Sequence, residues 1–229
     1  MTAKRRGITR AERSEKNRNA IMRAAEEVVG EYGYRDASIA RITEKAGVAE
    51  GTFYLYFKSR QELFDQLLPH LGEELIEYLK KRVSGSDGAL EVEERGFRGF
   101  FEFLQFNPSF FRILNEAEIE APKAHAVHFK KLRANYLVSL KRSWSRGELP
   151  GFEERELEVL VYMLMAARSY LYLRYSKTEG GPRPLPDWVV TAYLKVVIGA
   201  FGYGTESASK NPDAAPEKLR QIDRRPLDV

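Results

Sequence analysis

Side chains that commonly act as nucleophiles, general bases or metal ligands are scarce in this sequence of 229 residues. It contains three histidines and no cysteine, so thiolate chemistry, disulfides and cysteine-based zinc sites are excluded. His125 and His128 are three residues apart, a spacing that suits shared metal ligation on one helix. Because the pair is surrounded by lysines on an expected amphipathic helix, a solvated helix face explains it better, and we predict no metal site.

Catalytic motifs are not recognisable. No arrangement of Ser, His and Asp, no phosphate-cradling glycine loop and no zinc-protease motif occurs in the sequence. We therefore predict that the protein is not an enzyme and has neither catalytic residues nor a cofactor. The longest apolar runs are far below the roughly 20 residues of a membrane span, and the basic N-terminus lacks the apolar core of a secretory signal. We expect a cytoplasmic protein with no membrane partner.

Positive charge is concentrated at the start of the chain. Residues 1–60 contain 13 Lys and Arg against 8 Asp and Glu, whereas residues 61–229 contain 24 against 25. Neutralisation of phosphates by a nucleic-acid-binding protein requires such a local basic excess. Basic tails that only contact solvent produce the same count, so charge alone leaves both interpretations open.

Three helices are expected in this basic quarter. Apolar residues at i, i+3, i+4, i+7 and i+8 from Ile21 to Tyr32 indicate an amphipathic helix. A shorter helix follows Ser38, a natural N-cap, and ends at Gly47, after which "VAEGTFYLYF" indicates a third. Two short helices joined by a tight glycine turn behind a longer support helix are typical of a helix-turn-helix over residues 38–57. This arrangement favours DNA binding over an arbitrary helical core.

The rest of the chain also has helical patterns and no convincing strand pattern, so we predict an all-α fold. "SRQE", from Ser59, is a capping box that starts a fourth helix, which Pro69 should kink. Longer helices are expected over about 122–146 and 153–176, and a last one in the apolar stretch "WVVTAYLKVVIGAFGYG". The predicted organisation is a flexible basic arm (1–16), a helix-turn-helix DNA-binding domain (17–62), a larger helical ligand-binding and dimerisation domain (63–204) and a polar tail (205–229).

The stretch "IARITEKAGVAEGTFYLYFKSRQELF" resembles the DNA-binding signature of the tetracycline-repressor (TetR) family of bacterial regulators. The resemblance covers about residues 17–68, through the helix-turn-helix spacing, the G-T-F-Y-x-Y-F core and the S-R-x-E-L-F start of the fourth helix. It implies a homodimer of nine or ten helices, whose two recognition helices enter successive major grooves of a palindromic double-stranded DNA operator. It also implies a C-terminal effector pocket whose occupancy usually releases DNA, and association with the bacterial nucleoid.

Helical geometry separates the residues of the recognition helix. At about 100° per residue, Phe53 and Phe57 point to one side, toward the core, and Gly51 and Leu55 point to the other. We expect Thr52 and Leu55 to contact base edges, Leu55 through a thymine methyl group. Gly51 would allow a close approach of the backbone.

The flanking residues of the motif are expected to contact phosphates, apart from one local departure. Ala49 stands where many family members have serine, so a capping hydroxyl is missing. The adjacent Glu50 either accepts from a cytosine amino group, discourages non-specific binding or is a solvated turn residue. Tyr54 and Tyr56 either offer hydroxyls to phosphates or only line the core edge. The predicted DNA contacts are Ser38, Arg41, Glu50, Gly51, Thr52, Tyr54, Leu55, Tyr56, Lys58 and Arg60.

Seven of the 13 phenylalanines lie within residues 97–111. They are either ordinary core or the wall of a lipophilic pocket. Many large apolar side chains with few buried polar candidates favour an aromatic, fatty-acid or acyl-thioester effector. The predicted pocket residues are Phe97, Phe101, Phe106, Phe110, Phe111, Leu114, Tyr136, Trp144, Tyr162, Met163 and Met165.

The last two helices are apolar around most of their circumference and need a partner to cover them. The resemblance implies that they form a four-helix bundle with a second subunit. The predicted interface residues are Leu160, Leu164, Ala167, Leu171, Val190, Tyr193, Leu194, Val197, Ala200 and Phe201.

These observations together predict a ligand-responsive, dimeric transcriptional repressor. Its small lipophilic effector would bind the arrangement that is not competent for DNA more tightly and so shift the population. One alternative is a ligand-independent architectural DNA-binding protein, in which the aromatic region is only core and interface. Another is an activator of the same family, because the position of the operator decides between activation and repression.

Overall fold

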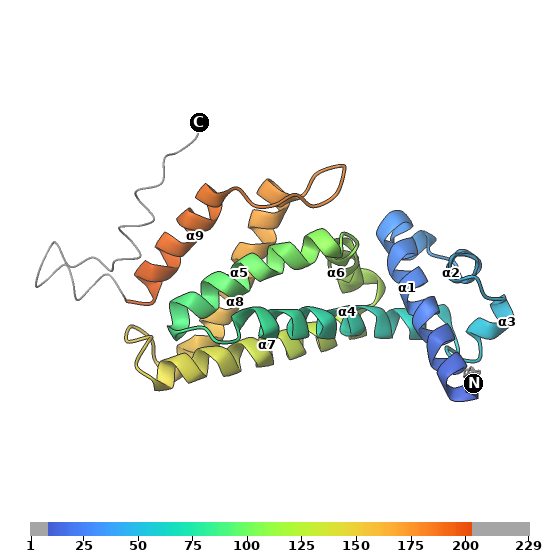
Figure 1. Ribbon diagram of the computed structural model, residues 1–229, viewed down its shortest axis with the longest axis horizontal. Coiled ribbons are helices and arrows are strands. Elements are labelled where there is room, and N and C mark those ends of the chain that lie inside the picture. Colours follow the sequence, from blue (N-terminus) through green and yellow to red (C-terminus); the bar gives the residue numbers. More distant parts are fainter. Residues whose placement is uncertain (1–8, 203–229) are drawn as a thin grey trace, which may run out of the picture. The chain divides into compact units, whose positions relative to one another are not determined.

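The computed structural model describes residues 9–202, and within this range the chain is helical and has no strand (Figure 1). This confirms the all-α fold. The predicted tail from residue 205 lies outside the described residues. No described helix is long and apolar enough to cross a membrane. The helices are α1 (Arg10–Asp36), α2 (Ile39–Ala46), α3 (Glu50–Phe53), α4 (Arg60–Val83), α5 (Gly88–Phe106), α6 (Phe110–Glu120), α7 (Pro122–Ser145), α8 (Leu157–Leu171) and α9 (Asp187–Ala200).

The first helix begins earlier than the sequence pattern predicted. The Thr9 hydroxyl accepts from the backbone N–H of Glu12, and the Glu12 carboxylate accepts from the backbone N–H of Thr9. This capping box satisfies two of the unpaired donors at the start of α1. Residues 10–16 are therefore helical, which corrects the prediction of a flexible arm through residue 16.

The helix-turn-helix follows at once. Ser38 caps α2, its hydroxyl accepting from the backbone N–H of Arg41 at 3.3 Å, and Gly47 ends the helix with a left-handed φ of 67°. No side chain caps α3 at Ala49. Because α3 ends at Phe53 and turns follow it, the third helix is shorter than the stretch "VAEGTFYLYF" indicated.

The described chain forms two compact units. Unit 1 contains the chain up to Glu74 together with Asn107–Lys130, and unit 2 contains Leu75–Phe106 and the chain from Lys131 onward. α6 belongs to unit 1 because it packs against α1. The compact unit that holds the helix-turn-helix therefore includes a segment distant in sequence, and its limits differ from the predicted domain boundary at residue 62.

Glycines in α1 let α6 approach closely within unit 1. A Cβ atom at Gly30 would lie only 2.0 Å from the Ser109 hydroxyl at the start of α6. In the adjoining core, Tyr34 packs edge-on against Phe64 of α4, with ring centroids 4.8 Å apart, and Phe53 and Phe57 are buried. The burial predicted for these two phenylalanines is confirmed.

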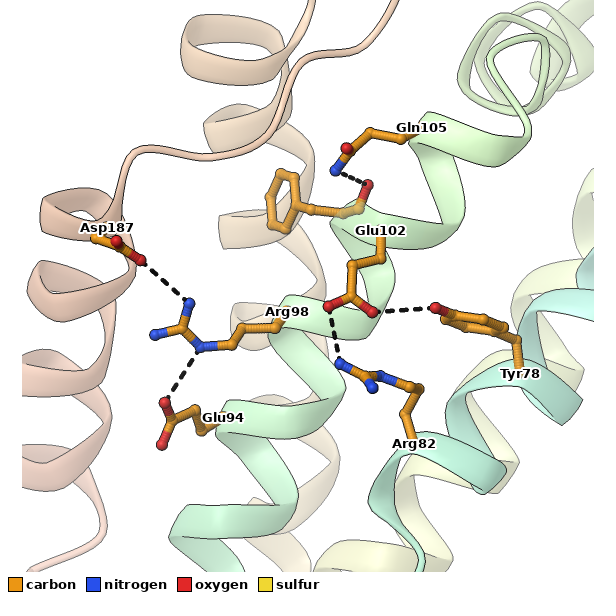
Figure 2. Close-up of polar contacts among 8 residues, drawn as sticks. Tyr78, Arg82, Glu94, Arg98, Glu102, Gln105 and Asp187 are labelled. Atoms are coloured by element: carbon orange, nitrogen blue, oxygen red, sulfur yellow. Dashed lines mark hydrogen bonds and ion pairs between the residues drawn. The ribbon is translucent and has the colours of Figure 1, made fainter.

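In unit 2, α5 is joined by polar contacts to the last turns of α4 and to the start of α9. Glu102 accepts from the Tyr78 hydroxyl at 3.0 Å and from Arg82 at 2.8 Å (Figure 2). On the neighbouring turn of α5, Arg98 pairs with Asp187 at 3.4 Å. These partly exposed contacts border the apolar core between α5 and α9.

Candidate functional site

The turn from α3 toward α4 exposes the residues predicted to contact bases. Leu55 is 77% exposed and Thr52 is half-buried, while a Cβ atom at Gly51 would meet no other group within 4 Å. Phe53 and Phe57 lie in the core behind them. The predicted separation of faces is confirmed, and the small, partly apolar outer face has the chemistry needed to approach base edges and thymine methyl groups.

Polar and cationic side chains surround this face. Tyr54 is exposed and packs edge-on against Phe53, with ring centroids 5.4 Å apart, and Tyr56 is half-buried. The Arg41 guanidinium stacks 4.4 Å from the ring centroid of Tyr32, an arrangement that orients a cation without neutralising it. Lys58, just before α4, is exposed, and Glu50, at the start of α3, is exposed as well. These positions suit contacts with phosphates on either side of a groove.

Arg60 has a role inside the head besides the one predicted. Its Nη1 donates to the backbone oxygens of Arg35 at 3.2 Å and Ala37 at 3.4 Å, and its guanidinium covers the Phe64 ring at 5.3 Å. The last carbonyl groups of a helix lack intrahelical partners, and Arg60 supplies donors at this end of α1. Arg60 therefore joins α4 to α1 inside the head, and its predicted contact with a phosphate stays a prediction.

A break in α1 is completed by α6. Gly33 has a φ of 80° and interrupts α1, so carbonyl groups just before it lose their helical partners. Arg112 of α6 donates to two of them, the backbone oxygens of Gly30 at 3.1 Å and Glu31 at 2.8 Å. A guanidinium is suited to this task because it presents several donors in a fixed plane.

Glu116 binds the other side of the same break. It accepts from the backbone N–H of Tyr34 at 2.9 Å and from Arg112 Nε at 2.6 Å. A Cβ atom at Gly33 would lie 2.7 Å from the Glu116 carboxylate, so both conformation and space require glycine there. Arg112 and Glu116, here called the α6 clamp, were missed in the sequence, where an i,i+4 Arg–Glu pair indicates only an exposed helix face.

Unit 2 contains a buried ion pair that the sequence analysis also missed. Glu93 of α5 is 2% exposed and Arg168 of α8 is 8% exposed, and Arg168 donates to Glu93 at 2.6 Å. The hydroxyls of Tyr136 and Tyr193 donate to the same carboxylate, which brings α5, α7, α8 and α9 together. We call these four residues the buried network. The available sequence signal was a single arginine in the apolar stretch "LVYMLMAARSYLYL", since buried charges occur mainly in pairs.

Burial and neighbouring charges shift the pKa values of three groups in the buried network. Burial raises the pKa of Tyr136 and Tyr193, so both hydroxyls remain protonated donors at neutral pH. Burial by itself lowers the pKa of Arg168, but the adjoining Glu93 carboxylate outweighs this effect and the pKa is raised. The prediction that few polar groups would be buried is therefore corrected for unit 2.

The predicted pocket residues do not form a single site. Phe97 stacks on Tyr193 with ring centroids 3.8 Å apart, so most of the aromatic cluster of α5 is core in this structure. The predicted residues are divided between the two units and differ in burial. In unit 2, Phe97 and Phe101 are buried, Tyr136, Trp144 and Met165 are half-buried, and Phe106, Tyr162 and Met163 are exposed. In unit 1, α6 contains the buried Phe110 and Phe111 and the half-buried Leu114.

The predicted interface residues mostly face the interior of unit 2. Leu160, Leu164, Val190, Tyr193, Leu194, Val197 and Phe201 are buried, Ala167 and Leu171 are half-buried, and Ala200 is exposed. A side chain buried within its own chain has no surface left for a partner, which corrects the seven buried members of this set, while Ala167, Leu171 and Ala200 stay predictions. The same helices and the turn after α8 expose another apolar set, here called the apolar stripe: Val159, Tyr162, Met163, Tyr170, Leu173, Trp188 and Val196.

A cavity of about 140 Å³ between α1 and α4 in unit 1 collects titratable groups. Burial, followed by the nearby Glu74 carboxylate, raises the pKa of Glu26 to about 7, with Glu27 acting in the same direction and Arg23 opposing it. His70 lies 3.6 Å from Glu74. Across residues 9–202, no three His, Cys, Asp or Glu side chains are arranged to hold a metal ion.

We expect Glu26→Gln to stabilise the protein at pH 8 and to leave it unchanged at pH 4.5. The folded-state pKa of Glu26 is raised from 4.5 to about 7, so its contribution to stability is complete below pH 4.5 and is lost as the pH rises through 7. Allowing for partial exposure, the gain at pH 8 should be about 1–2 kcal/mol. Urea unfolding at both pH values measures it, with the exposed Glu44→Gln as control. Equal effects at the two pH values would contradict the assignment.

Comparisons with known proteins agree with the exposed helix-turn-helix. Residues 21–67 match the family model described as bacterial regulatory proteins, tetR family. The uncharacterized HTH-type transcriptional regulator YvdT of Bacillus subtilis is 42% identical over 67 residues, which are 29% of this chain and 34% of that protein. The fatty acid metabolism regulator protein of Bacillus subtilis is 35% identical over 71 residues, 31% of this chain and 37% of that protein. The chain thus spans about a third of the length of these two relatives.

Beyond the head, similarity is visible in the fold. The crystal structure of the transcriptional regulator FadR from Bacillus subtilis in complex with stearoyl-CoA has a TM-score of 0.63 to this chain. The match covers 81% of this chain and 98% of that one at 21% sequence identity. The helical arrangement is therefore shared where the sequences have diverged.

Proposed function

We propose that the chain, whose residues 21–67 match the family model of bacterial regulatory proteins, tetR family, is a dimeric, ligand-responsive transcriptional repressor. The observation that carries this proposal is the outer face after α3, where Gly51, Thr52 and Leu55 are accessible in front of a phenylalanine core. Arg41 and Lys58 provide cations beside it. Base-edge contacts specify a sequence, whereas phosphate contacts position the protein on it.

A second copy of the chain is the proposed cover for the apolar stripe. Met163 of α8 is 65% exposed, and Trp188 of α9 meets Tyr175 edge-on with ring centroids 5.2 Å apart, so the two helices present large apolar groups together. Exposed apolar patches of this kind mark interfaces, and a two-fold dimer would present two recognition surfaces to the half-sites of a palindrome. Sedimentation equilibrium of Met163→Glu against the wild type tests this interface.

The proposed effector is a lipophilic acyl compound, either a fatty acid or an acyl thioester. Support comes from the fatty acid metabolism regulator that resembles the head and from the FadR fold that binds stearoyl-CoA. Unit 2 of this chain supplies aromatic rings on α5, among them the buried Phe97 and Phe101, and a lipophilic lining of this kind suits an acyl chain. Release of DNA requires that the effector prefer the arrangement that binds DNA weakly.

Two variants should separate positioning from base recognition. Lys58→Ala should weaken binding to all DNA sequences and reduce the salt slope by about one unit, because it removes one phosphate contact. Leu55→Ala should instead change base preference at one position of each half-site, by about 1–3 kcal/mol. Fluorescence anisotropy over a salt series and a panel of operator variants measures both effects. Lys80→Ala, a surface cation of unit 2 paired with Glu77, is the control and should change neither.

The function itself is tested by selecting DNA from a random pool with the full-length protein. A palindromic consensus, protected as one site in footprinting and released by stearoyl-CoA or free stearate, is the expected result. Continuous protection without a consensus would identify a ligand-independent architectural DNA-binding protein. A consensus that neither acyl compound releases would reject the proposed effector class and leave DNA recognition intact.

A further inference from the structure

His128 lies in the interior of unit 1 without a hydrogen bond. It is 1% exposed, and within residues 9–202 neither Nδ1 nor Nε2 has a hydrogen-bond partner. Burial, together with the neighbouring His125, lowers the pKa of His128 to about 4, so the imidazole is neutral at pH 7. This position corrects the expectation that His128 belongs to a solvated helix face.

The imidazole ring is pressed against the backbone of α4. A Cβ atom at Gly72 would lie 2.1 Å from His128 Nδ1 and 2.8 Å from Cε1, so any side chain at residue 72 would force the ring or the helix to shift. Phe110 of α6 packs edge-on against the ring from another side, with centroids 5.9 Å apart. The position of the ring therefore sets how closely α4 approaches α7 within unit 1.

α4 is weakened near this contact and joined to the recognition surface at its other end. Pro69 has no N–H to donate to the carbonyl one turn earlier, and glycine at residue 72 lowers helix propensity. At the start of α4, Arg60 donates to the backbone oxygens of Arg35 and Ala37, and Ser59 caps the helix directly after the recognition turn. A displacement of α4 at Gly72 would therefore be transmitted to the head.

An unpaired imidazole is a poor choice if the residue only fills space. A neutral imidazole carries one donor and one acceptor, and leaving buried polar groups unsatisfied costs stability. An apolar side chain would fill the same interior without that cost. A buried, unpaired polar group in a folded protein therefore calls for an explanation.

We propose that His128 is a positioning residue for the DNA-binding head, its ring acting as a stop that fixes α4 at Gly72. The inference rests on the proposed function, because its consequence is measured as operator affinity. Adding volume at residue 72 or removing the ring at residue 128 changes the same separation between α4 and α7. The two substitutions must therefore affect DNA binding in a dependent way, which substitutions at independent sites do not.

The test is a double-mutant cycle with the full-length chain and an operator that the wild type selects from random DNA. Gly72→Ala and His128→Ala are each expected to weaken operator binding about tenfold, since each displaces α4. In Gly72→Ala/His128→Ala the new methyl group occupies space left by the imidazole. Affinity should then return to within about threefold of the wild type.

Gly96→Ala is the matched control, because a Cβ atom at this helical glycine of α5 would meet only Val83 at 3.6 Å. It should bind the operator as the wild type does. The inference is wrong if the two losses of operator affinity multiply in Gly72→Ala/His128→Ala. It is also wrong if Gly72→Ala binds the operator as tightly as the wild type does. If Gly72→Ala does not fold, the operator affinity of Gly72→Ala/His128→Ala is compared with that of His128→Ala. Weaker binding by the double variant then contradicts the inference. Failure of the wild type to select any sequence would instead reject the proposed function.

Discussion

Replacing Arg168 by methionine should lower the free energy of unfolding by about 3–5 kcal/mol, because the Glu93 carboxylate would stay buried without its cation. Glu93 is 2% exposed and takes its ion pair from Arg168 at 2.6 Å. The two tyrosine hydroxyls that remain can donate to the carboxylate but cannot neutralise it. Urea unfolding at pH 7 measures the loss.

A double replacement separates the need for charge from the need for volume. Glu93→Met/Arg168→Met should recover most of the stability, since apolar side chains of similar size avoid the desolvation that both ions incur. Arg82→Met is the matched control. It breaks the partly exposed pair with Glu102 (Figure 2) and should lose less than about 1 kcal/mol. A comparably small loss for Arg168→Met would show that solvent reaches Glu93 and would contradict the burial of this ion pair.

Arg112→Ala is expected to weaken operator binding about 10- to 100-fold. The substitution removes charge-assisted hydrogen bonds to the carbonyls of Gly30 and Glu31, each worth about 1.5–3 kcal/mol. The break in α1 would lose its support from α6, and the support helix behind the recognition surface would no longer be held in one arrangement. Anisotropy with the operator selected by the wild type, together with urea unfolding, measures affinity and stability separately.

The control for Arg112 is a similar pair with no contact to the head. Arg95 of α5 pairs with Glu91 one turn away at 2.7 Å, so Arg95→Ala removes an i,i+4 arginine–glutamate contact of the same kind in unit 2. It should leave operator affinity unchanged. If Arg112→Ala binds the operator as tightly as Arg95→Ala, the α6 clamp does not hold the head, and the arginine has only the small role of a surface ion pair.

Local sequence rules predicted the recognition element well because its determinants are local. Residues 54–57 continue α3 as a turn, with the N–H of Phe57 donating to the oxygen of Phe53, so Phe53 and Phe57 still face away from Leu55, and the caps at Ser38 and Gly47 depend on residues within one turn. The family comparison confirms the resemblance over residues 21–67. The contacts with DNA proposed for Thr52 and Leu55 stay predictions.

Contacts between distant segments could not be derived from the sequence in the same way. Arg60 was predicted to contact a phosphate. Its hydrogen bonds to the backbone oxygens of Arg35 and Ala37 depend on where another helix ends, and the sequence around Arg60 does not show this. In α8 and α9 both faces are apolar, so periodicity could not tell the core side at Leu164 from the outer side at Met163. A helical pattern shows on which face of its helix a side chain lies, but it does not show which residue of another helix the side chain contacts.

The dependence of α1 on α6 also limits how the head can be reused in other proteins. A fragment ending at Glu74 would contain the whole segment matched by the family model, yet it would lack Arg112, Glu116 and Ser109, which fit against Gly30 and Gly33. A chimaeric regulator made by joining that fragment to a foreign sensor would inherit the recognition residues with an uncapped break behind them. For transplantation, the smallest self-contained part is the discontinuous pair of segments that form unit 1.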